Sequence, residues 1–148
     1  MLEIANALES KIKEALIAFQ PFTEADWSSK PNPKKWSRKE ILGHLIDSAQ
    51  NNTQRVVRSQ QVNDLHIIYS QNHWVAAHNY QSYPITELQL IWFYTNKHFC
   101  HLLKNVPTEK YQNRLNMGSA NAPDLWTMER VVQDYIVHLE HHLKQIML

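Results

Sequence analysis

Three histidines lie close together in the stretch DYIVHLEHHLKQI, residues 134–146. His138 and His142 are four positions apart, so on a helix they lie one turn apart on the same face, where both imidazoles can reach one metal ion. The apolar residues around them place this pair toward the core and His141 toward solvent. A pair with this spacing is a weak signal alone, because a metal site needs a further ligand from elsewhere in the chain.

A third histidine, His44, lies in the stretch KWSRKEILGHLIDSA, at the margin of the apolar face of a second predicted helix. Ser48 and Asn52 follow it along the same margin. Buried polar side chains need hydrogen-bond partners, so this row hints at a water-containing pocket. If the two helices pack antiparallel, His44, His138 and His142 come to the same level. Three neutral imidazoles with one open position are typical of a catalytic metal site.

The alternative interpretation is three imidazoles that are hydrogen-bonded at the edge of the core without a metal. Asp47, three positions after His44, could orient a ligand or act as a general base, although an exposed helix carboxylate fits the pattern equally well. One crossover histidine could enter the pocket, but each is more typical of a structural or solvated residue: His66, His73 and His78. His98 and His101 are expected on the surface.

Four segments have the periodicity of amphipathic helices and must position these histidines. They run from Leu2 to Phe19, from the Ser37–Glu40 capping box to about residue 59, from Pro84 to about residue 102, and from about Trp126 to Met147, with Asp124 or Thr127 as the cap of the last. Strand signals are weak, and LHIIYS is the only short β-like run. The pattern predicts an all-α fold, a four-helix bundle.

The connections between these helices are long, so at least one is expected to cross the bundle. The connection between the second and third helices is rich in aromatic residues. We expect its last part to cover the metal site, with Trp74, Tyr80 and Tyr83 shaping substrate choice. The alternative is that these rings only seal the bundle. Trp36 is expected to be a packing residue.

Composition narrows the function classes. A chain of 148 residues with 15 basic and 14 acidic side chains predicts a single domain, residues 1–148, without the basic surface that nucleic acids or anionic membranes require. No apolar run approaches the roughly 20 residues that span a bilayer, and the first residues do not resemble a signal peptide. A cytoplasmic protein is expected. Cys100 is the only cysteine and is expected to be a buried, unreactive thiol.

The stretches KWSRKEILGHLIDSA and DYIVHLEHHLKQI, with NHWVAAHNYQSYP between them, resemble the DinB/YfiT-like family of metal-dependent enzymes. The resemblance covers essentially the whole chain. It implies a four-helix bundle with a long crossover connection and a metal held by His44, His138 and His142. The implied cofactor is one divalent ion, zinc, nickel or iron, with water completing its coordination.

The leading functional prediction is a metal-dependent enzyme of the hydrolase type that acts on a small molecule. The alternative is an S-transferase that uses a low-molecular-weight thiol, since a thiolate can take the position of hydroxide at such a metal. A bundle that binds a metal or small ligand without catalysis is a third interpretation. The sequence does not separate them, does not identify catalytic residues beyond the ligands, and is compatible with a homodimer.

Overall fold

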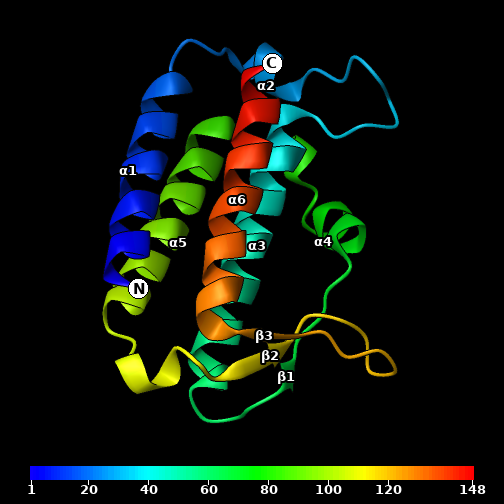
Figure 1. The fold of residues 1–148 in the computed structure, drawn as a ribbon. Coiled ribbons are helices and arrows are strands. Elements are labelled where there is room, and N and C mark those ends of the chain that lie inside the picture. The colour runs from blue at the N-terminus through cyan, green and yellow to red at the C-terminus, as the bar shows by residue number, and fades with distance from the viewer.

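Four long helices dominate the computed structural model, which describes residues 1–148 (Figure 1). They are α1 (Leu2–Ala18), α3 (Arg38–Ser59), α5 (Ile85–Lys104) and α6 (Met128–Met147). Shorter helices lie in the connections, namely α2 (Glu24–Ser28), α4 (Gln71–His78), and the single 3-10 turns η1 (Tyr80–Ser82) and η2 (Thr108–Lys110). The predicted four-helix bundle is confirmed, and its helix bounds differ from the predicted ones by at most two residues. None of the helices is long and apolar enough to cross a membrane.

Side-chain caps set where the two histidine-bearing helices begin. The Ser37 hydroxyl accepts a hydrogen bond from the backbone N–H of Glu40, and the Glu40 carboxylate accepts one from the N–H of Ser37 at 2.7 Å. This is the predicted capping box. Thr127 caps α6 by accepting from the N–H of Arg130. Each cap fixes the first turn of its helix, and regular helix geometry then fixes the face on which each histidine lies.

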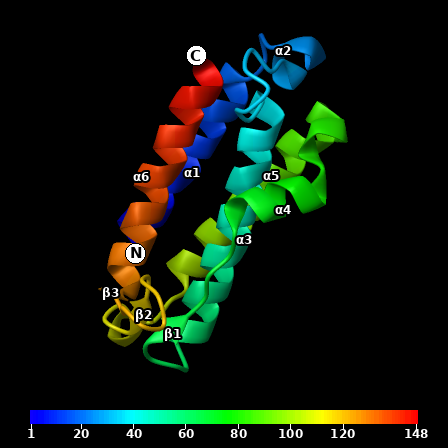
Figure 2. The ribbon, with the colours of Figure 1, turned by 90° about the vertical axis from the view of Figure 1, so that its right-hand side faces the viewer.

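The chain direction shows which connection crosses the bundle (Figures 1 and 2). Helices α1 and α6 run one way, and α3 and α5 run the opposite way. Because α3 and α5 are parallel, the segment that joins them, residues 60–84, must return along the length of the bundle. This is the predicted long crossover. The same arrangement makes α3 antiparallel to α6, which is the packing that the three histidines require.

A small sheet closes the end of the bundle where α3 ends and α6 begins (Figure 1). Strand β1 (Leu65–His66) pairs parallel with β2 (Arg114–Asn116), and β2 pairs antiparallel with β3 (Leu125–Thr127). The sequence indicated only the first of these strands. The other two were missed because neither lies in a β-like run as long as LHIIYS, and their pairing depends on contacts beyond their own three residues.

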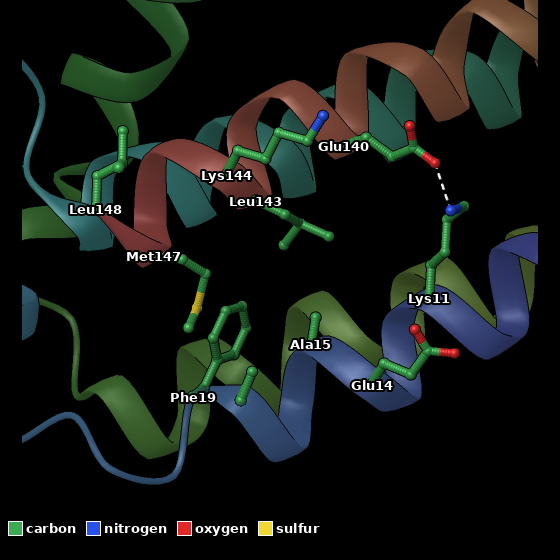
Figure 3. A pocket seen from close by; sticks show the side chains of 10 residues that line it. Lys11, Glu14, Ala15, Phe19, Glu140, Leu143, Lys144, Met147 and Leu148 are labelled. Atoms are coloured by element: carbon green, nitrogen blue, oxygen red, sulfur yellow. Dashed lines mark ion pairs between the residues drawn. The ribbon is translucent and has the colours of Figure 1, made fainter.

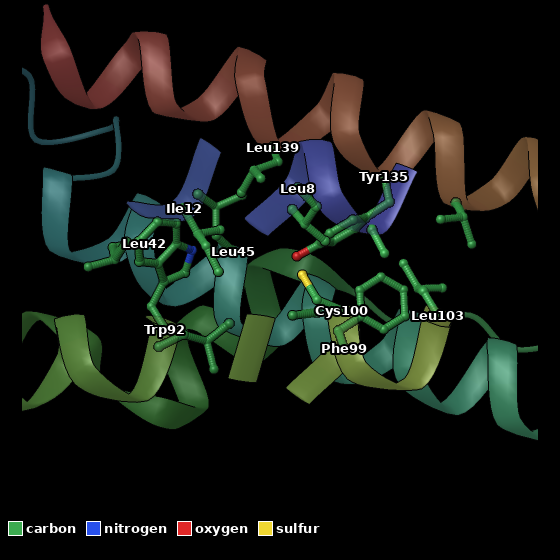
Figure 4. Packing of buried hydrophobic residues seen from close by; sticks show 14 of the residues in the cluster. Leu8, Ile12, Leu42, Leu45, Trp92, Phe99, Cys100, Leu103, Tyr135 and Leu139 are labelled. Carbon is green, nitrogen blue, oxygen red and sulfur yellow. The ribbon is translucent and has the colours of Figure 1, made fainter. Parts of the chain in front are cut away.

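All four long helices contribute to one apolar core (Figure 4). Its fully buried side chains include Leu8, Ile12, Leu42, Leu45, Trp92, Phe99, Tyr135 and Leu139. Each such side chain stabilises the fold by about 1.5–3 kcal/mol through its burial. Cys100 is 1% exposed, and burial raises the pKa of its thiol to about 11, as expected for an unreactive cysteine.

Candidate metal centre

His44 on α3 meets His138 and His142 on α6. The Nε2 atoms of His44 and His138 are 3.0 Å apart. The ring centroid of His142 lies 4.8 Å from that of His44 and 4.5 Å from that of His138. One nitrogen from each of the three rings lies within 4.8 Å of the other two. The structure therefore brings together the three residues that the sequence analysis selected.

The arrangement of the nitrogens fits a shared ion. Two imidazole nitrogens about 2.1 Å from one tetrahedral ion are separated by about 3.4 Å, so the His44–His138 separation needs only a small adjustment. No carboxylate or thiol joins the three rings. A ligand set of three imidazoles leaves coordination positions open, as in catalytic rather than structural zinc sites.

Burial keeps the three rings uncharged. It lowers the pKa of His44 to about 3 and that of His138 to about 4, because desolvation disfavours the imidazolium and the neighbouring rings repel a second charge. The pKa of His142 is also lowered, again mainly by burial. Metals bind neutral imidazole, so protons do not compete with a metal at these rings near neutral pH.

Gln145 is a neighbour of the centre that the sequence analysis missed. Its Oε1 accepts a hydrogen bond from Nδ1 of His142 at 2.8 Å, and its Nε2 donates to Nε2 of His141 at 3.1 Å. The first bond places the proton of His142 on Nδ1, which leaves the Nε2 lone pair free for a metal. His141 itself is exposed, as predicted. The sequence signal for Gln145 was its spacing, three residues after His142 and four residues after His141.

The prediction that Asp47 could be an exposed helix carboxylate is wrong. Asp47 is fully buried, accepts a hydrogen bond from the Tyr80 hydroxyl at 2.6 Å and lies 3.1 Å from Nδ1 of His78. The crossover covers this flank of α3, and burial raises the pKa of the carboxyl. Asp47 also does not orient His44, whose buried Nδ1 has no hydrogen-bond partner.

No crossover histidine joins the three rings. His78 faces Asp47, His66 bonds through Nε2 to the carbonyl of Gly118 at 2.9 Å, and His73 is exposed. His98 and His101 on α5 are exposed, as expected.

A cavity of about 120 Å³ lies beside His138, between α3 and α6. Ser48 and Asn52 line it, as the polar row on α3 suggested. The other lining residues are Arg55, Tyr69, Met117, Val131, Asp134, Tyr135 and His138. Of these, Arg55 and Asp134 carry charge and were missed, although Arg55 continues the Ser48–Asn52 row and Asp134 lies one turn before His138.

The aromatic crossover is arranged differently from the prediction. Trp74 lines a separate cavity of about 340 Å³ with residues of α3 and α5, and Tyr80 packs against Gly43. Tyr69, from the first half of the crossover, is the aromatic residue that lines the cavity at His138. Trp36, which was expected only to pack, lies with its ring centroid 5.1 Å from that of His44.

A groove of about 810 Å³ lies between α1 and α6 (Figure 3). An ion pair between Lys11 and Glu140 bridges it, and Ala15, Phe19 and Leu143 are among its apolar lining. None of the three clustered histidines lines this groove. Its size therefore does not make it the reactive site.

Solved structures with the same fold are known. YfiT from Bacillus subtilis, described as a probable metal-dependent hydrolase with an unusual four-helix bundle topology, superposes with a TM-score of 0.80 at 16% identity, over 98% of this chain and 81% of YfiT. The mycothiol-dependent maleylpyruvate isomerase gives a TM-score of 0.76 at 9% identity, over 98% of this chain but 58% of the isomerase. At these identities the likeness shows the fold alone.

Comparison of the sequence with protein families assigns the family, which the structural likeness alone does not. No protein with a curated description matches the chain. The DinB superfamily matches residues 7–146, a range that includes both histidine-bearing helices and the crossover between them. The chain belongs to the DinB superfamily.

Proposed function

We propose that the protein is a metal-dependent enzyme of the hydrolase type in which His44, His138 and His142 hold one divalent cation. The observation that carries this proposal is the meeting of three neutral imidazoles from two antiparallel helices, with two Nε2 atoms 3.0 Å apart. The description of YfiT as a probable metal-dependent hydrolase gives further support. The metal is zinc, nickel or iron.

A divalent cation held there would act as a Lewis acid and lower the pKa of a water or thiol in its open position. The protein supplies the rest. Burial keeps His44 and His138 neutral, and Gln145 orients His142. The cavity beside His138 gives a small substrate a place next to one of the three rings.

Transfer of a low-molecular-weight thiol is the second candidate. It is favoured by the similarity to the isomerase, which is described as mycothiol-dependent. It also needs no separate general base, and the buried carboxylate of Asp47 faces Tyr80 and His78 rather than a ligand histidine. A third reading, metal binding without catalysis, differs from both in the outcome of an activity assay.

Metal analysis tests the centre first. Protein purified without chelator and without a nickel column should contain about one divalent ion per chain by mass spectrometry of the elements. Alanine at His44, His138 or His142 should reduce this content sharply. His141→Ala is the matched control, because His141 lies on the same helix but outside the three rings. Equal losses in His141→Ala and His138→Ala would reject the proposed ligand set.

Activity then separates the two candidates. Protein reloaded separately with zinc, nickel or ferrous iron is given an ester series in water, and an aryl chloride together with cysteine or glutathione. Ester cleavage without thiol supports hydrolysis. Metal-dependent formation of the thioether, with release of chloride and a proton, supports S-transfer. Full metal occupancy without either activity across broader panels supports the non-catalytic reading.

A further inference from the structure

Arg55 brings a positive charge to the cavity beside His138 without forming an ion pair. Its Nη2 donates to the carbonyl of Ile67 at 2.8 Å, and its Nη1 donates weakly to Oδ1 of Asn52 at 3.4 Å. Its Nε is buried and has no partner. Arg55 takes part in none of the ion pairs of the molecule. Of the five N–H groups of the guanidinium, only two have acceptors, and both acceptors are neutral.

This placement is costly for the free protein. Burial lowers the pKa of Arg55, which is the expected consequence of removing its charge from water, and the carboxylate of Asp134 only partly offsets the loss. A guanidinium stays protonated at any physiological pH. Arg55 is half-buried, and a charge withdrawn from water without an ion-pair partner destabilises a fold. An anion that entered the cavity would supply that partner.

The rest of the cavity suits a small molecule with one anionic end. Ser48 and Tyr69, which carry hydroxyls, line it together with Arg55. Val131 and Met117 are its apolar residues, and His138 is shared with the three rings. Asp134 is the only acidic residue of the lining and is exposed, so solvent screens its repulsion. A volume of about 120 Å³ corresponds to about four water molecules of the liquid, which admits a small acid but not a large substrate.

We propose that this cavity is a carboxylate subsite, in which Arg55 holds the carboxylate of a small substrate and directs the remainder of the molecule toward His44, His138 and His142. Arginine suits this role because its planar fork matches the two oxygens of a carboxylate. The inference rests on the proposed function for its reacting end. The subsite itself depends only on Arg55 and the cavity, so it can be tested on protein without metal.

The test is a titration of metal-free protein with propionate, in which two-dimensional NMR spectra of the backbone amides measure binding. The neutral isostere propionamide and methyl phosphate are titrated in parallel. Propionate should shift amides around the cavity, whereas propionamide should not. Arg55→Gln should weaken propionate binding at least tenfold. Arg58→Gln, which removes an exposed positive charge from the same helix, should leave it unchanged.

Two further variants keep the result interpretable. If Arg55→Gln does not fold, Arg55→Lys keeps the charge but loses the planar fork, and should bind propionate at least threefold more weakly. Asp134→Asn should bind it as well as or better than the original protein, because it removes the negative charge of the lining. Equal binding of propionate and propionamide, or unchanged binding in both Arg55 variants, overturns the proposal. Tighter Arg55-dependent binding of methyl phosphate overturns the carboxylate assignment.

The same titration on metal-loaded protein separates this inference from the proposed function. Arg55-dependent binding in a protein that takes up no metal would leave the subsite standing and remove the metal enzyme. Normal metal uptake together with propionate binding that is the same in the Arg55 variants would reject the subsite and leave the metal enzyme standing. The carboxylate would then be bound elsewhere.

Discussion

The ring of Tyr80 lies directly over Gly43 of α3, so that a Cβ built on Gly43 would come within 2.0 Å of the ring. Tyr80 is buried, and its hydroxyl donates to the buried carboxylate of Asp47, one turn further along the helix. The absence of a side chain at position 43 therefore allows the crossover to pack against the helix that carries His44.

Gly43→Ala should destabilise the protein despite the better helix propensity of alanine. Displacing the Tyr80 ring costs about 1–3 kcal/mol, against a gain of about 1 kcal/mol from propensity. Urea unfolding measures the change. In a Tyr80→Ala background the same substitution should be neutral or stabilising, because the clash is gone. The same loss in both backgrounds would show that the contact does not explain the glycine.

Gln145→Leu should weaken metal binding without unfolding the protein. It removes the acceptor that holds the proton of His142 on Nδ1, and loss of such a partner typically lowers metal affinity 10- to 100-fold. Competition with a chromogenic chelator measures the affinity. His141→Ala breaks only the other hydrogen bond of Gln145 and is the control. An affinity equal to that of the original protein would mean that Gln145 has no positioning role.

The stability of the metal-free protein should decrease as the pH falls below 6.5, the ordinary pKa of histidine. In the folded state burial lowers the pKa of His44 to about 3 and that of His138 to about 4. Between those values and pH 6.5 the unfolded chain binds protons that the folded chain does not, so the free energy of unfolding decreases with falling pH. For His44 alone the loss between pH 6.5 and pH 5 is roughly 1–2 kcal/mol.

Comparing chemical unfolding of the original protein and His44→Gln at these two pH values isolates this effect. The variant should lose less stability between pH 6.5 and pH 5, because glutamine does not titrate in this range. A parallel decrease in the two proteins would show that other groups cause the acid sensitivity.

Trp74→Ala should leave metal content unchanged and change propionate binding only slightly, because Trp74 packs against Tyr69 but does not itself line the cavity beside His138. Tyr69→Ala, in contrast, should change propionate affinity, since it removes a wall and a hydroxyl of that cavity. Elemental analysis and the NMR titration measure the two properties. Equal effects of both substitutions on propionate binding would support the original prediction that Trp74 contributes to substrate choice.

The sequence determined the features that depend on neighbours within one or two helical turns. The capping box at Ser37 and Glu40 marked the start of α3, and apolar periodicity marked the four helices. The spacing of His138 and His142 placed both on one face and His141 on another. These rules are local, because helix geometry relates residue i to residues i+3 and i+4 whatever the rest of the chain does.

The tertiary structure decided which environments those side chains enter. From its spacing Asp47 could be a surface carboxylate or a residue of the site, and in the structure it is buried with Tyr80 and His78 of the crossover against it. The guanidinium of Arg55 lies in a cavity because Tyr69 and Met117, from segments far apart in the sequence, complete its wall. Burial, cavity shape and the partners of a charge depend on contacts between distant segments, and helical periodicity carries no information about those contacts.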